Sequence, residues 1–301
     1  MEEQGFRLVI TAMRTLTSSD IPSAVELSAA ANWNQTPEDW HRIIHLSAKT
    51  CRCIEDAGKV IATTTLLPYS THLAWIGMVL THPECRRQGL ARRLMEDAIS
   101  NAEREGIRTL KLDATDEGRP LYESLGFVVE KIVERWGIDS QIGDAAQNAV
   151  DNSSATKFCS HDVAISDDLL AQDTSAFGVS RNTLLKLLSQ SGRRNVSAHG
   201  YVLSRPGTNA HYLGPCLADS ETEASMLIAA HLRDHSNPQN ERSSSDLPGW
   251  YWDLFPANPG AARCARRLGF TRRRTLWRMR RGQEIENNDA MVYAIAGFEL
   301  G

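Results

Sequence analysis

The sequence lacks the features that would place a chain in a membrane or outside the cell. No apolar run approaches the roughly 20 residues that cross a bilayer, and the first residues, with Glu2 and Glu3, lack the basic-then-apolar order of a signal peptide. The 6 cysteines are scattered without paired CxxC units, so neither a zinc site nor a disulfide framework is indicated. We therefore expect a cytoplasmic protein without a membrane partner and without a metal.

The sequence also lacks a strong excess of charge of one sign. The formal net charge is −4 over 301 residues, and 42% of the residues are hydrophobic. This balance is ordinary for a globular protein and gives no global attraction to nucleic acid or anionic lipid. The length predicts about two domains.

One turn combines glycine and basic residues between a strand pattern and a helix pattern. It spans residues 81–91 and follows an apolar run of strand length at 74–80. A helix that begins directly after such a turn presents unpaired N–H groups and the positive end of its dipole. Gly89 leaves room for an anion, and Arg86 and Arg87 add charged donors. The turn indicates a phosphate site, although an ordinary tight turn has the same local pattern. The apolar stripe of the predicted helix is Leu90, Leu94, Ala98 and Ala102.

Two motifs together resemble those of a known family. The first is Arg86-x-x-Gly89-x-Ala91, and the second, at residues 113–127, carries Tyr122 and ends in Leu-Gly-Phe. In this order and separation they resemble the coenzyme A signatures of the GNAT superfamily of N-acetyltransferases. The resemblance covers roughly residues 6–136 and extends more faintly over the remainder.

The resemblance implies that acetyl-CoA binds along the 74–80 strand and the following turn. Gly77 interrupts this strand, which is typical of a bulge or of the close passage of a ligand or another main chain, with a packing role as the alternative. Thr115 stands where many relatives have asparagine, and its hydroxyl can still hydrogen bond to the coenzyme. The implied coenzyme residues are Met78, Val79, Leu80, Arg86, Arg87, Gln88, Gly89, Leu90, Ala91 and Thr115.

Two residues are candidates for the proton transfers. The resemblance makes Tyr122 the general acid for the departing thiolate, whereas position alone favours a core tyrosine. Some family members use a glutamate on the central strand, but residues 73–81 contain no carboxylate. Asp113, at the end of the predicted strand 109–113, is then the best local candidate for the general base, directly or through water. The alternative is a cap or turn former.

The acceptor side is predicted from the helix pair near residues 31–40. Trp33 and Trp40 could enclose an amine by cation–π contact, with Asn34 between them, and Glu38 or Asp39 could attract it. Alternatively the two tryptophans only seat the helices. Residues 249–253 form a second aromatic candidate with the same ambiguity.

An internal repeat predicts the architecture. The triplet Leu268-Gly269-Phe270 repeats Leu125-Gly126-Phe127, and each precedes a strand-like stretch with arginine and tryptophan. We expect an α/β (mixed α+β) protein of two tandem GNAT folds, each a mostly antiparallel mixed sheet flanked by helices. The predicted parts are a catalytic domain at 1–138, a linker at 139–160 and a second domain at 161–301.

The second copy differs where the chemistry would be. Residues 211–231 do not reproduce the glycine turn, Ala265 stands opposite Tyr122, and acidic residues gather near the corresponding helix start. We expect the second domain to lack a coenzyme site and to be structural or to form one wall of the substrate cleft. Nine arginines among residues 263–281 could bind RNA or another acidic partner, but ion pairing on a strand is favoured, so no nucleic acid is expected.

These patterns predict an acetyl-CoA-dependent N-acetyltransferase. It would move an acetyl group directly to a primary amine of a small molecule or peptide, as a monomer or homodimer. The alternative is a CoA-binding sensor or interaction module without turnover.

Overall fold

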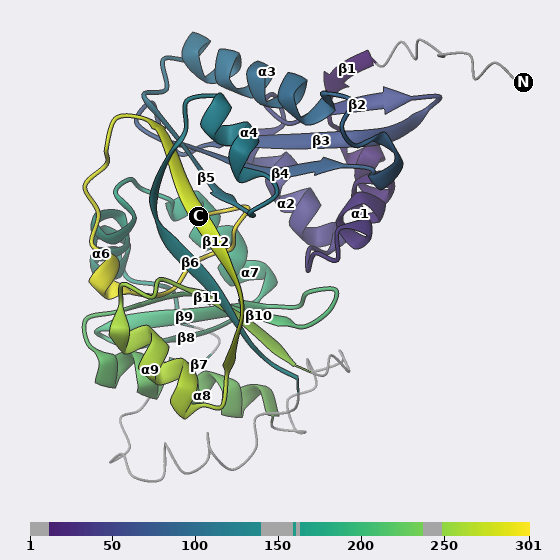
Figure 1. Cartoon of the computed structure of the whole chain (residues 1–301). Helices are drawn as coiled ribbons and strands as arrows, with labels where there is room; N and C mark the ends of the chain where they lie inside the picture. Colours follow the sequence, from purple (N-terminus) through teal and green to yellow (C-terminus); the bar gives the residue numbers. More distant parts are fainter. Residues whose placement is uncertain (1–11, 140–158, 161–162, 237–248) are drawn as a thin grey trace, which may run out of the picture.

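The computed structural model describes residues 12–139, 159–160, 163–236 and 249–301 (Figure 1). Residues 140–158 of the predicted linker, and residues 1–11, lie outside the described part of the chain. The predicted mixed α/β class, with a mostly antiparallel sheet and flanking helices, is confirmed.

The described strands form one continuous sheet in the order β1-β2-β3-β4-β5-β12-β6-β11-β10-β9-β8-β7, with β13 paired to β10. The pairs β4–β5 and β10–β11 are parallel, and the other described pairs are antiparallel. The strands are β1 (Ala12–Thr15), β2 (Arg52–Asp56), β3 (Lys59–Pro68), β4 (Ala74–Thr81), β5 (Thr109–Ala114), β6 (Val128–Ile138), β7 (Cys159–Ser160), β8 (Arg193–Val196), β9 (Gly200–Arg205), β10 (His211–Ala218), β11 (Trp250–Leu254), β12 (Thr271–Gly282) and β13 (Val292–Ala294).

Helices cover both faces of the sheet. Along β2, Cys53 packs in the core cluster of the first two helices, whereas Ile54 packs in a cluster with the third, because successive strand residues point to opposite faces. The helices are α1 (Ile21–Ala30), α2 (Pro37–Ser47), α3 (Leu90–Arg104), α4 (Arg119–Ser124), α6 (Asp167–Phe177), α7 (Asn182–Ser191), α8 (Glu221–Ser236) and α9 (Pro259–Arg267).

Local sequence signals place several of these elements. Helix α2 begins at Pro37, and Thr36 caps it by accepting a hydrogen bond from the Asp39 N–H at 3.3 Å. The hairpin of β2 and β3 turns at Ala57 and Gly58, which have φ values of 48° and 82°. The apolar stripe of α3 is buried as expected.

The two halves of the chain exchange strands β6 and β12. β12, from the second half, lies between β5 and β6, and β6, from the first half, pairs on its other side with β11. Figure 1 shows β6 and β12 side by side through the middle of the molecule. The sheets of the two predicted folds are therefore joined into one continuous sheet, because each half pairs with a strand of the other.

Each half contains a pair of parallel strands that diverge. β4 and β5 pair only at residues 74–75 and 110–111, and β10 and β11 pair at 211–213 and 250–252. In the second half, β13 pairs with β10 at Cys216 and Leu217 and also contacts β11, so a strand of the protein occupies the gap.

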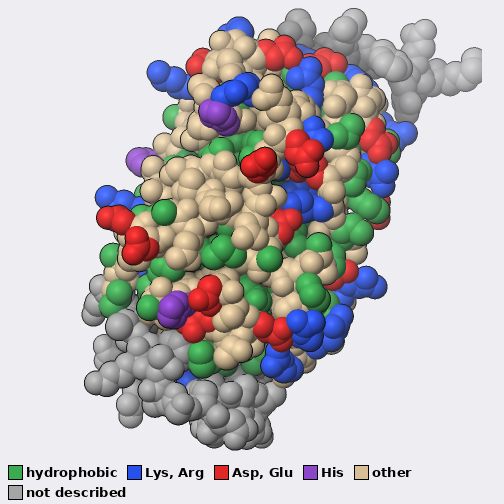
Figure 2. Space-filling view, turned by 90° about the vertical axis from the view of Figure 1, so that its left-hand side faces the viewer, with side chains coloured by type: hydrophobic (Ala, Val, Ile, Leu, Met, Phe, Trp, Pro, Cys, Tyr) green, Lys and Arg blue, Asp and Glu red, His purple; other side chains and the backbone are tan. Residues whose placement is uncertain are grey.

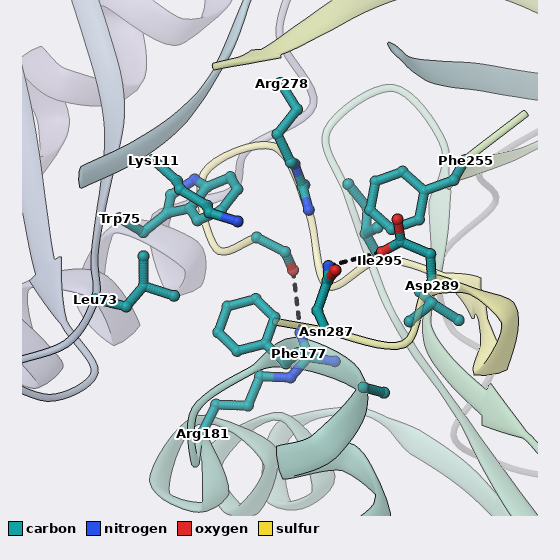
Figure 3. A pocket seen from close by; sticks show the side chains of 13 residues that line it. Leu73, Trp75, Lys111, Phe177, Arg181, Phe255, Arg278, Asn287, Asp289 and Ile295 are labelled. Atoms are coloured by element: carbon teal, nitrogen blue, oxygen red, sulfur yellow. Dashed lines mark hydrogen bonds between the residues drawn. The ribbon is translucent and has the colours of Figure 1, made fainter. Parts of the chain in front are cut away.

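The last residues of the chain cross from the second gap to the first. We call residues 295–301 the C-terminal segment. Its Phe298 carbonyl accepts a hydrogen bond from Trp75 Nε1 at 2.8 Å, and its Gly301 carbonyl accepts one from Arg181 Nη1 at 3.0 Å. Figure 3 shows the second of these bonds beside the Trp75 and Phe177 rings, where side chains from both halves face a small internal pocket. The segment thereby joins β4 to the second half.

Candidate active site

A cavity of about 910 Å³ lies where β4 and β5 diverge. The turn before α3, helix α4, the loop before α2, β12 and the C-terminal segment all contribute to its walls. The predicted site residues that line it are Trp33, Met78, Val79, Leu80, Arg86, Arg87, Gly89, Leu90, Ala91, Asp113, Thr115 and Tyr122. Three predicted site residues, Asn34, Trp40 and Gln88, do not line it.

The turn before α3 has the backbone of an anion site. Gly89 caps the helix with φ 80°, and Arg87 has φ 64°, so two residues of the turn are left-handed. No main-chain N–H group of residues 87–92 donates a hydrogen bond to another residue of the described part of the chain. Arg86 is exposed and lies 3.8 Å from Glu117. Unpaired N–H groups at the start of a 15-residue helix favour an anion at this end of the cavity.

Strand β4 carries both features that a glycine within a strand predicts. A bulge interrupts its pairing with β3, where Met78 has φ 48° and its carbonyl accepts a hydrogen bond from Thr63 Oγ1 at 2.8 Å. A main chain also passes close by, since a Cβ atom on Gly77 would lie 2.9 Å from the carbonyl oxygen of Glu299. Only glycine admits the C-terminal segment at this position without a shift.

Tyr122 borders the cavity from α4. Its ring packs edge-on against Phe127 at 6.2 Å between centroids, and Gly118 leaves room for it, because a Cβ there would lie 3.0 Å from the ring. The hydroxyl has no hydrogen-bond partner within the described residues. Burial raises the pKa of Tyr122, so the phenol keeps its proton at neutral pH and can only donate it. Thr115 Oγ1 accepts a hydrogen bond from the Gly118 N–H at 3.2 Å and so helps to start α4.

Asp113 does not present its carboxylate to the cavity. The side chain is fully buried and accepts two hydrogen bonds from Arg278, each 2.8 Å long. Burial raises the pKa of Asp113, and the Arg278 guanidinium opposes that shift. Arg278 itself lies between the rings of Trp75 and Phe255 (Figure 3). This geometry favours a structural ion pair over the predicted general base.

Of the three predicted acceptor residues, only Trp33 lines the cavity. Trp40 is fully buried, and its indole N–H donates to Ser28 Oγ at 3.1 Å. The side-chain oxygen of Asn34 accepts hydrogen bonds from the N–H groups of Asn209 and Ala210. Trp40 therefore seats the helices, as the alternative stated, and Asn34 joins the two halves.

Glu299 was missed by sequence reasoning. It lines the cavity, and its two carboxylate oxygens accept hydrogen bonds from Arg205 Nη2 and Gln35 Nε2, each at 2.9 Å. Burial raises the pKa of Glu299 above its ordinary value, although Arg205 lowers it in part. In the sequence, Gly77 indicated that another main chain could pass close to β4, but nothing identified that chain as the one that contains Glu299.

The described residues give no evidence for a metal site or for a membrane-spanning helix. No cluster of three or more His, Cys, Asp or Glu side chains is placed to hold a metal ion within them. No described helix has the length and apolar character needed to cross a membrane.

The fold and the cavity define a class of protein. The profile of the acetyltransferase (GNAT) family matches residues 12–127, and that of an acetyltransferase (GNAT) domain matches residues 169–294. The chain belongs to the GNAT acetyltransferase family and contains two GNAT domains.

Individual relatives agree with this assignment. The chain is 26% identical over 289 residues to a holothin acyltransferase from Pseudoalteromonas sp. (strain SANK 73390), covering 92% of this chain and 90% of that protein. A proposed acetyltransferase from Pyrococcus horikoshii has a similar structure, with a TM-score of 0.81, 18% identity and coverage of 100% of this chain and 99% of the other. A tandem GNAT protein of the clavulanic acid biosynthesis pathway has a TM-score of 0.66 at 14% identity, with coverage of 90% and 98%. At these identities the two structures support the fold alone.

Proposed function

We propose that the protein is an N-acetyltransferase that moves an acetyl group from acetyl-CoA directly to a primary amine of a small molecule or peptide. The observation that carries this proposal is the single cavity that runs from the unpaired N–H groups of residues 87–92 to Tyr122 and Glu299. Residues that supply an anion site, a proton donor and a carboxylate thus line one cavity.

The open gap carries groups that would hold the coenzyme. The N–H groups of the turn, with Arg86 and Arg87, would hold its diphosphate, and the edge of β4 at Met78, Val79 and Leu80 would guide its extended arm between β4 and β5. The gap offers β4 main chain that is no longer paired to β5, which is what an added strand-like ligand requires.

The coenzyme supplies a thioester, whose C–S bond breaks as a C–N bond forms to the amine. Tyr122 would give its phenolic proton to the departing sulfur. Glu299 would accept the proton that the amine loses. Its raised pKa makes its carboxylate a stronger base than that of an exposed glutamate. Asp113 takes no part in this scheme, since Arg278 holds both of its carboxylate oxygens, whereas Arg205 holds only one oxygen of Glu299.

Release of free thiol from acetyl-CoA across a panel of primary amines tests the proposal. We expect release that depends on the amine and falls when propionyl- or butyryl-CoA replaces acetyl-CoA. Tight CoA binding without amine-dependent release would favour the non-catalytic sensor instead. Release that prefers a longer acyl group would keep acyl transfer and reject acetyl-CoA as the donor.

A further inference from the structure

The arginine run of residues 263–281 is almost entirely neutralised within the protein. Seven of its nine arginines form an ion pair with a carboxylate, and Arg266 lies over the Trp136 ring. The space-filling view in Figure 2 likewise shows basic and acidic side chains interspersed over one face of the molecule. Ion pairing therefore accounts for the run except at Arg266 and Arg274, and of these two only Arg274 lines the cavity.

Arg274 differs from its neighbours because it lines the cavity and pairs with no carboxylate of the described residues. It is half-buried on β12, its guanidinium lies 5.3 Å from the centroid of the Phe298 ring, and its Nε–H is buried without an acceptor. Arg135 lies over the same ring at 4.6 Å, but Asp253 neutralises it through hydrogen bonds of 2.7 and 2.6 Å.

The charge on Arg274 is thus only partly hydrated, and no carboxylate of the described residues forms an ion pair with it. Burial and the nearby Arg135 lower the pKa of Arg274 to about 10, so it remains protonated at neutral pH. A partly desolvated guanidinium is stabilised by a carboxylate, with which it can form two parallel hydrogen bonds. Phe298 and Leu276 beside it are apolar and would exclude water from such a pair.

The position of Arg274 points to the acceptor and not to the coenzyme. Its contact, Phe298, directly precedes Glu299, the carboxylate that would receive the amine proton, and both belong to the C-terminal segment. The diphosphate site of residues 87–92 belongs to a different wall of the cavity, the start of α3.

We propose that Arg274 binds a carboxylate of the acceptor, so that the acceptor is a primary amine that also carries a carboxylate. This inference rests on the proposed acetyl transfer. It assigns the second half of the chain a part in specificity, because both β12 and the C-terminal segment come from that half.

Matched acceptors test the inference with the full chain and acetyl-CoA. We would compare ω-amino acids of increasing length with their carboxamides, because a distant carboxylate changes the pKa of the amine little. The wild type should prefer the best acid over its amide by about 10- to 100-fold in kcat/KM, the range expected for a hydrogen bond to a charged group. Arg274→Gln should remove that preference, Arg274→Lys should keep part of it, and the KM for acetyl-CoA should change less than about twofold.

Arg273→Gln is the matched control, since Arg273 is an exposed neighbour that pairs with Asp139. It should leave the preference unchanged. Equal use of acid and amide by the wild type, or a best acceptor with no anionic group, would overturn the inference and leave acetyl transfer intact. A higher KM for acetyl-CoA in Arg274→Gln, without a change in acceptor preference, would also overturn it and assign Arg274 to the coenzyme.

A protein that turns over no amine would contradict the proposed function, and binding would then decide the inference separately. Calorimetric titration of the CoA-loaded protein with 6-aminohexanoate and with its carboxamide supplies the measurement. Tighter binding of the acid that is lost in Arg274→Gln would support the inference, and equal binding would overturn it.

Discussion

The two gaps in the sheet, one between β4 and β5 and the other between β10 and β11, are alike in the strands that form them and differ in what fills them. In each, a glycine stands at the fourth residue of the first parallel strand, Gly77 in β4 and Gly214 in β10, and the same C-terminal stretch approaches both. A Cβ would lie 2.9 Å from the Glu299 carbonyl oxygen at Gly77 and 2.2 Å from the Ile295 carbonyl oxygen at Gly214. In the second half β13 also enters the gap, whereas the first gap keeps a cavity of about 910 Å³.

The first residues of the helices beside the two gaps, α3 and α8, also differ. Helix α3 begins at unpaired N–H groups with arginines nearby, while α8 begins with acidic residues. Glu221 there forms ion pairs with Arg263 and Arg267, and the Glu223 N–H donates a hydrogen bond to Ser220 Oγ at 3.3 Å, so groups of the protein itself occupy this helix start. The comparison teaches that the second half places its own chain where, under the proposed function, the first half binds a ligand.

The largest effect expected from this comparison is at Tyr122. Tyr122→Phe should lower kcat by about 100- to 10,000-fold, because the sulfur would lose its proton donor, with little change in the Kd of acetyl-CoA. Tyr293→Phe, in the strand that fills the second gap, is the control and should leave kcat unchanged. Steady-state kinetics and calorimetry check both. Equal kcat in the wild type and Tyr122→Phe would remove Tyr122 from the mechanism.

Glu299→Gln should lower kcat/KM by about 100-fold at neutral pH. Because burial raises the pKa of Glu299, the wild-type rate should increase with pH as the carboxyl loses its proton, over a range above that of an ordinary glutamate. The variant should lose this limb of the pH profile. Glu223→Gln, at a buried glutamate of the second half, should keep it, and a limb unchanged in Glu299→Gln would assign the base elsewhere.

Replacing Gly77 and Gly214 by alanine, one at a time, distinguishes the roles of these two glycines. In Gly77→Ala the added Cβ should displace the C-terminal segment, raise the acceptor KM by about 10-fold and destabilise the fold by about 1–3 kcal/mol. Gly214→Ala should lower the Tm further, because its contact is closer and its φ is 143°, but the folded fraction should keep its acceptor KM. The same acceptor KM in wild type and Gly77→Ala would show that the segment does not shape the acceptor side.

The smallest effect is expected at the helix starts. Arg87→Ala should raise the Kd of acetyl-CoA by about 10-fold through loss of one charged donor, with kcat retained. Glu221→Gln, at the start of α8, should leave this Kd unchanged. Equilibrium titration of both variants measures the difference, and a Kd that moves equally in both would contradict a single coenzyme turn in the first half.

Local features of this protein could be predicted because short-range physics fixes them. The cap at Thr36, the turn at Ala57 and Gly58 and the helix after Gly89 each depend on a few adjacent residues. Most of the site residues selected by family resemblance line the cavity, including Tyr122.

Long-range features could not be predicted in the same way. The exchange of β6 and β12 could not be predicted because both strands follow the same Leu-Gly-Phe motif and both contain adjacent arginine and tryptophan, so these signals do not tell which half each strand joins. Glu299 was hidden because it reaches Gly77 across more than two hundred residues of chain. Asp113 was a candidate general base in the sequence because its partner, Arg278, lies on β12, which no local signal places beside β5.

A crystal structure of the protein with acetyl-CoA tests the central claim most directly. The account predicts one coenzyme in each chain, with its diphosphate on the N–H groups of residues 87–92, its arm between β4 and β5, and its sulfur beside Tyr122. A coenzyme bound elsewhere, or a diphosphate that leaves those N–H groups without contact, would contradict it.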